Sequence, residues 1–83
     1  MNKEMQLLKQ VKEKYLLQLK DLYEIDDTSN VELDDITSIV FIISLQDNFF
    51  ILTVEEHTEC DIAQLDEVRG SSLIDCLEKL LKQ

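Results

Sequence analysis

The hydrophobic positions near both ends of the chain recur with the spacing of amphipathic helices. Over residues 4–24 an apolar residue returns every three or four positions, which predicts a helix with one buried stripe. A last helix is predicted from Ser72 onward, because Ser72 is a favoured N-cap and Asp75 follows three residues later. Lys79 and Lys82 suit the negative pole of this helix. The two stripes comprise Leu8, Val11, Tyr15, Leu19 and Leu22, and then Leu73, Ile74, Leu77, Leu80 and Leu81.

The middle of the chain is too apolar for its periodicity to define one structure. Residues 36–54 contain one charged residue, Asp47, and twelve large apolar residues. The β-branched and aromatic content favours strands, and a turn around Asp47 would give a β-hairpin over residues 38–54. The same residues also form one broad apolar face of a helix, so periodicity leaves both interpretations open.

Between this segment and the last helix the signals are weaker. Thr53 and Glu56 match a capping box, which predicts a short helix beginning near Val54. Ile62, Leu65 and Val68 then form a short apolar stripe before the single glycine, Gly70.

Composition supports one folded domain over residues 1–83. A hydrophobic content of 45% is ample for one compact core. The chain has no proline and one glycine, which favours helices joined by polar loops such as residues 25–35.

Charge narrows the class of partner. The net charge is −10, with five Lys against two Glu in residues 1–20 and sixteen acidic against three basic residues thereafter. A nucleic-acid partner is excluded, because neutralising phosphates requires clustered Lys and Arg. The acidity instead suits steering toward basic patches on other proteins.

Targeting and thiol signals predict a cytoplasmic chain. The N-terminal residues lack a signal-peptide core, and no apolar run reaches the length of a membrane span, so no membrane insertion is expected. Cys60 and Cys76 stand outside any metal-binding or CxxC spacing and are predicted to be free thiols.

No catalytic or metal constellation is apparent, and we predict that the protein is not an enzyme. His57 is the only imidazole, and it has no partner at ligand spacing. Ser38 lies just after the acidic pair Asp34 and Asp35, without a nucleophile elbow. From spacing alone it is either a structural residue or an attachment site at a loop-to-helix junction.

Two segments carry a family resemblance. Residues 24–42, EIDDTSNVELDDITSIVFI, resemble the loop and serine motif of acyl carrier proteins and peptidyl carrier domains. Residues 67–81, EVRGSSLIDCLEKLL, resemble their last helix. The resemblance implies an all-α fold, a small four-helix bundle of the acyl-carrier type. The alternative is an α+β fold with a hairpin at residues 38–54.

The resemblance also implies a function. Ser38 would carry a covalent 4'-phosphopantetheine arm attached by a phosphopantetheinyl transferase. The arm would present a thioester-linked acyl or aminoacyl group to loading and synthase enzymes of fatty-acid, polyketide or nonribosomal-peptide biosynthesis, with the carrier acting as a monomer. Thr37 departs from the family's usual Asp, and a second register places Asp35 at the serine position. That register would leave a carrier-like or small helical interaction module without an arm.

Acidic residues bracket the apolar segment and predict a footprint for partners with basic docking patches. A competing hypothesis is a small helical or α+β adaptor whose apolar residues 36–54 dock to a partner or dimerise. The predicted partner-binding residues are Asp34, Asp35, Val40, Ile43, Asp47, Glu55 and Glu56.

Overall fold

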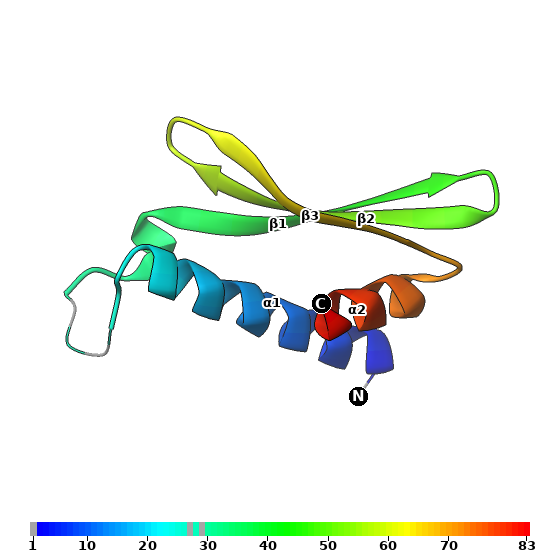
Figure 1. The fold of residues 1–83 in the computed structure, drawn as a ribbon, viewed down its shortest axis with the longest axis horizontal. Coiled ribbons are helices and arrows are strands. Elements are labelled where there is room, and N and C mark those ends of the chain that lie inside the picture. Colours follow the sequence, from blue (N-terminus) through cyan, green and yellow to red (C-terminus); the bar gives the residue numbers. More distant parts are fainter. Residues whose placement is uncertain (1, 27, 29) are drawn as a thin grey trace.

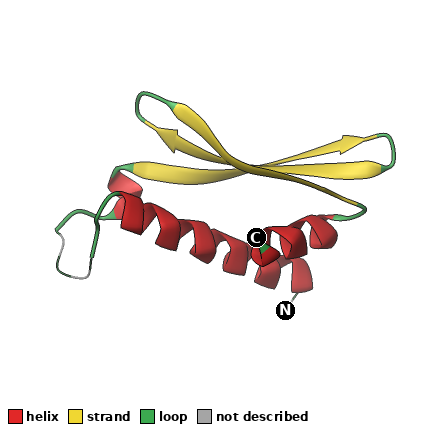
Figure 2. Ribbon diagram, in the orientation of Figure 1, coloured by secondary structure: helices red, strands yellow, loops and turns green. Residues whose placement is uncertain are grey.

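The computed structural model describes residues 2–26, 28 and 30–83, which form a two-layer α+β fold. A three-stranded antiparallel sheet makes one layer, and both α-helices pack on the same face of it (Figures 1 and 2). In chain order the elements are α1 (Lys3–Leu22), a 3-10 turn η1 (Leu33–Asp35), β1 (Thr37–Gln46), β2 (Phe49–Thr58), β3 (Ile62–Gly70) and α2 (Leu73–Lys82).

The predicted all-α four-helix bundle is wrong, because the apolar middle of the chain forms a hairpin. β1 and β2 pair antiparallel from Gln46 opposite Phe49 to Thr37 opposite Thr58. The two-residue turn between them places Asp47 in the left-handed region, with φ of 50°. β-branched and aromatic side chains suit this pleated, half-buried surface. The alternative hairpin at residues 38–54 is therefore the correct one, and its strands are longer than predicted.

The predicted short helix near Val54 is also wrong. Thr53 and Glu56 continue β2, and the chain then returns as β3 beside it. The sheet order is β1-β2-β3, so β2 is the central strand.

The two terminal helices are confirmed. In α1 the Asn2 side chain accepts a hydrogen bond from the Glu4 N–H at 2.7 Å, and Val11, Tyr15 and Leu19 are buried. In α2 the Ser72 hydroxyl accepts from the Asp75 N–H at 3.1 Å, as the sequence predicts.

Replacing Ser72 with Ala is expected to lower the free energy of unfolding by about 1 kcal/mol, because α2 loses its N-cap. Ser71→Ala is the matched control, since among the described residues only the Ser71 backbone N–H, and not its hydroxyl, makes a hydrogen bond. Urea unfolding of both variants measures the difference. Equal losses would show that the cap does not stabilise α2.

The core lies between the sheet and the helices. Leu52 and Val54 from β2 meet Val11 from α1 and Leu77 and Leu80 from α2, and all of these side chains are fully buried. The Tyr15 hydroxyl donates to Asp66 at 2.8 Å across the same layer. Burial, followed by this hydrogen bond, raises the pKa of Tyr15.

Candidate docking surface

β1 is an edge strand without the features that usually protect such edges. It pairs with β2 on one side, and no other described strand pairs with its second side (Figure 1). From Thr37 to Gln46 it contains no charged residue, proline or glycine. Natural proteins commonly shield edges with Lys, Pro or bulges, because an exposed edge can pair with another chain. β1 is thus open to a further strand.

The opposite edge, β3, is built differently. It carries Asp66, Glu67 and Arg69, and its pairing with β2 is interrupted by a register shift at Val54 and Glu55. The bulge and the charges make β3 a poorer template for strand addition. The two edges therefore offer an internal comparison.

The register of the hairpin defines which backbone groups of β1 face outward. A two-residue turn makes Gln46 and Phe49 a hydrogen-bonded pair, and bonded and non-bonded pairs then alternate along the ladder. The residues whose N–H and C=O groups point away from β2 are accordingly Thr37, Ile39, Phe41, Ile43 and Leu45. They supply the donors and acceptors that an added strand needs.

Exposed apolar side chains lie along the part of β1 nearest the hairpin turn. Ile42, Ile43 and Leu45 are 40%, 50% and 66% exposed. Ile39 and Phe41 pack against the core, so alternation places Ile43 and Leu45 on the helix side of the sheet as well. The helix side of β1 is therefore partly uncovered near the turn.

A hollow of about 270 Å³ lies beside this part of β1. It is lined mainly by apolar side chains from both layers, together with one carboxylate: Met5 and Leu8 of α1, Phe41 and Ile43 of β1, Leu52 of β2, Leu73 of α2, and Glu4 of α1. Met5 is 65% exposed, and Leu17 and Leu22 elsewhere on α1 are exposed to a similar extent, at 66% and 69%. The hollow is thus an apolar recess next to free backbone groups.

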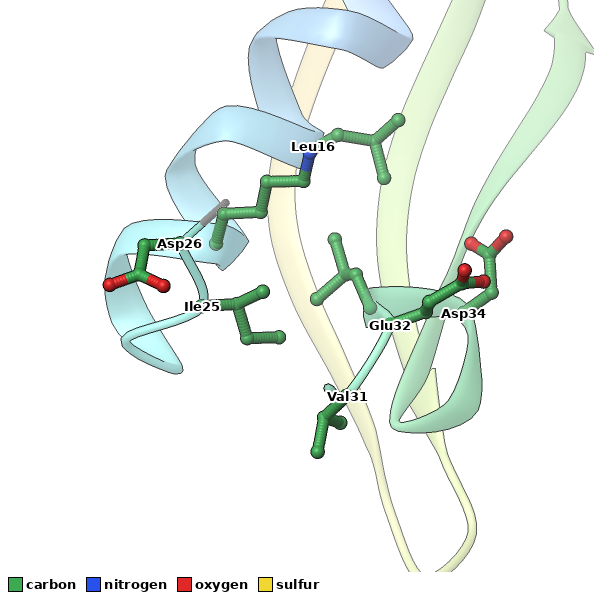
Figure 3. Close-up of a pocket in the computed structure, with 8 residues that line it drawn as sticks. Leu16, Ile25, Asp26, Val31, Glu32 and Asp34 are labelled. Carbon is green, nitrogen blue, oxygen red and sulfur yellow. The ribbon is translucent and has the colours of Figure 1, made fainter. Parts of the chain in front are cut away.

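Acidic residues lie just beyond both ends of β1. Asp34 and Asp35 in η1 precede the strand, Asp47 in the turn follows it, and all three side chains are exposed. A pocket between α1 and the following loop extends the negative charge at the first end (Figure 3). Its lining combines apolar Leu16, Ile25, Val31 and Leu33 with three carboxylates, Asp26, Glu32 and Asp34, and one ammonium group, that of Lys20.

Ser38 does not stand at the start of a helix, where the carrier resemblance would place it. It is an exposed residue of β1, directly opposite His57 of β2. The His57 Nε2 lies 2.9 Å from Glu55 Oε1 on the same strand. Among the described residues no hydrogen bond joins the Ser38 and His57 side chains, and no group of three possible metal ligands occurs. No sequence signal places Ser38 beside His57, because this pairing depends on the register of the hairpin.

The remaining predicted contacts lie on different faces. Val40 and Glu55 are paired and half-buried on the sheet face opposite the helices. Glu56 points toward the helices, is 7% exposed and accepts a hydrogen bond from the Tyr23 hydroxyl at 2.6 Å. This bond raises the pKa of Tyr23. The Glu56 carboxylate is therefore held inside the fold, whereas Ile43, Asp34, Asp35 and Asp47 surround the free edge.

The two cysteines are free, as predicted: Cys60 is exposed and Cys76 is buried in the core. Burial raises the pKa of the Cys76 thiol, which lies within 3.7 Å of the Phe50 carbonyl oxygen. The Cys76 thiol is thus a packing group of α2.

Comparison with known proteins supplies no family. The chain matches no protein-family model, and neither the curated proteins nor the solved structures contain a significant match. Within the part of the chain that the structure describes, no helix is both long and apolar enough to cross a membrane.

Proposed function

We propose that this chain is a protein-interaction module that binds an extended segment of another protein as an additional strand along β1. The observation that carries the proposal is the ten-residue β1 edge, which has no charge, proline or bulge. In strand addition, backbone hydrogen bonds provide affinity and alternate side chains provide specificity. The outward-facing backbone groups and the recess beside Ile43 match these two requirements.

This proposal follows the adaptor hypothesis in its α+β form. The fold lends the carrier hypothesis no support, because Ser38 lies within a strand. The docking surface is the edge of β1 rather than the broad uncovered face of the sheet. That face mixes Val40 and Ile51 with Glu55 and His57, whose side chains lie 2.9 Å apart, and with Arg69, which lies over the Phe49 ring.

A proline in β1 tests the proposal. Peptides selected from a random library against the immobilised chain should bind the Ile43→Pro variant at least about tenfold more weakly, measured as Kd by calorimetry. Proline removes the outward N–H of Ile43 while leaving the ladder to β2 intact.

The matched control is Ile62→Pro on the opposite edge. Ile62 is 61% exposed, compared with 50% for Ile43, and it is the first residue of β3, a position where proline is tolerated. We expect Ile62→Pro to leave the Kd unchanged. Peptides that bind both variants as tightly as the original chain would show that β1 is not the docking edge.

A further inference from the structure

The charges around β1 allow the partner to be specified more closely, on the basis of the proposed function. We infer that the added strand comes from a different protein, carries basic residues at both of its ends and places one bulky apolar side chain in the recess beside Ile43. The acidic ends of β1, the register of the edge and the recess support the three parts of this inference.

The acidic ends favour a partner with basic flanks. Glu32, Asp34 and Asp35 cluster at the beginning of β1, and Asp47 lies beyond its end. None of the four carboxylates forms an ion pair with another described residue. A strand rises about 3.3 Å per residue, so Lys or Arg residues separated by about nine positions would reach both ends. β1 itself carries no charge that would oppose such a partner.

A second copy of this chain fits the edge poorly. The five outward-facing residues are centred on Phe41, and an antiparallel pair that uses all of them places Thr37 of one copy opposite Leu45 of the other. The Asp34 and Asp35 end of each copy would then meet Asp47 of the other copy, at both ends of the interface. Like charges in direct opposition destabilise strand pairs, and the net charge of −10 on each chain adds to the repulsion.

The recess favours one anchoring side chain. Alternate residues of a strand beside β1 would point toward the helix layer, where Met5 and Leu8 of α1 face Phe41 and Ile43. A leucine or aromatic side chain entering this recess would cover Met5, which is 65% exposed. Buried apolar anchors of this kind often dominate the binding energy of an interface.

Synthetic peptides of defined sequence test the inference on the full chain. The probe has a central stretch of about nine residues in which Thr and Val alternate around a central Leu. Two further Lys residues are attached at each end of this stretch. A second peptide has Glu in place of the four Lys, and a third has Ser in place of the central Leu. We expect the Kd of the Lys-flanked probe to be at least about tenfold lower than that of either other peptide.

Protein variants locate the binding site. Asp35→Asn combined with Asp47→Asn should reduce the preference for Lys over Glu flanks, whereas Asp61→Asn combined with Glu67→Gln, which removes two charges beside the other edge, should leave it unchanged. Raising the salt from about 50 mM to about 500 mM should also reduce the preference, because exposed charges are screened. Ile43→Pro and Ile43→Lys should both abolish binding of the probe, and the Lys variant keeps the backbone of β1 intact if the Pro variant fails to fold.

The outcomes distinguish a failure of this inference alone from a failure of the proposed function. If Lys- and Glu-flanked peptides bind equally and Ile43→Pro abolishes both, the basic partner is wrong and strand addition stands. Sedimentation that shows a dimer dissociated by Ile43→Lys would also overturn the inference, because the occupant would be a second copy. If no peptide binds and the chain sediments as a monomer, both the inference and the proposed function fail.

Discussion

Truncation of Leu52 to Ala should lower the free energy of unfolding by about 3 kcal/mol. Leu52 lies in the central strand β2, has no exposed surface and belongs to the core cluster with Val11, Leu77 and Leu80. Removing its branched end leaves a cavity between the sheet and both helices. A chain of 83 residues has a total stability of about 4–12 kcal/mol, so this loss is a large fraction of the whole.

Leu45→Ala is the matched control, since the same substitution is made in the neighbouring strand at a side chain that is 66% exposed. We expect a change of no more than about 0.5 kcal/mol there. Urea unfolding measures the stability of both variants. The slope of the unfolding free energy against urea concentration should match that of the original chain, because an unchanged slope shows that only the stability has changed. A similar loss at both positions would contradict the placement of the core.

The terminal helices could be predicted from the sequence because their buried stripes are separated from polar faces. Val11, Tyr15 and Leu19 in α1, and Leu77 and Leu80 in α2, are buried at the spacing that defines a helix. Ser72 and Asp75 fix the start of α2 through a local interaction that needs no knowledge of the fold. Local signals of this kind can be read from the sequence.

The hairpin could not be assigned because both of its faces are largely apolar. Val40 and Ile42 lie on one face of β1, and Ile39, Phe41 and Ile43 lie on the other, so the period of two that marks a half-buried strand is obscured. The resemblance to carrier proteins then favoured the helix. The intrinsic preference of β-branched and aromatic residues for strands was the correct guide.

In β3 the apolar residues Ile62, Leu65 and Val68 have the spacing of a helix, and a β-bulge explains why. Asp66 pairs with Val54 and Gln64 with Glu55, so Leu65 between them is an extra residue in β3. The bulge lets Leu65 and Val68 both pack against the core although they are three positions apart. Spacing of three is typical of a helix, and a bulge that depends on strand pairing cannot be read from the sequence.

The candidate surface was predicted in part. Asp34 and Asp35 were selected as acidic residues before the apolar segment, Ile43 as an apolar contact within it and Asp47 as its one charged residue. In the structure these four residues lie along the edge of β1 or just beyond its ends. Their role as the ends of a free strand depends on the sheet order, which places β1 outside β2. Met5 and Leu8 were missed because an apolar residue in an amphipathic helix is ordinarily part of the core.

The single glycine leads to the second large effect, since Gly70→Ala is expected to lower the free energy of unfolding by about 2 kcal/mol. Gly70 is buried at the end of β3, and a Cβ atom there would lie 2.7 Å from the Asp75 Oδ2 atom and 3.1 Å from the Cys76 nitrogen. The Asp75 carboxylate accepts a hydrogen bond from the Ser71 N–H at 3.0 Å, which lowers its pKa and holds it over the glycine.

A double-mutant cycle identifies the cause of this loss. In an Asp75→Ala background the carboxylate is absent, so Gly70→Ala should reduce stability clearly less than it does in the original chain. The part of the loss that persists would come from the close approach to the Cys76 nitrogen, which belongs to the backbone of α2 and cannot rotate away. Urea unfolding of the four proteins measures the cycle. Equal losses in both backgrounds would show that β3 and α2 are not joined through the contact between Gly70 and Asp75.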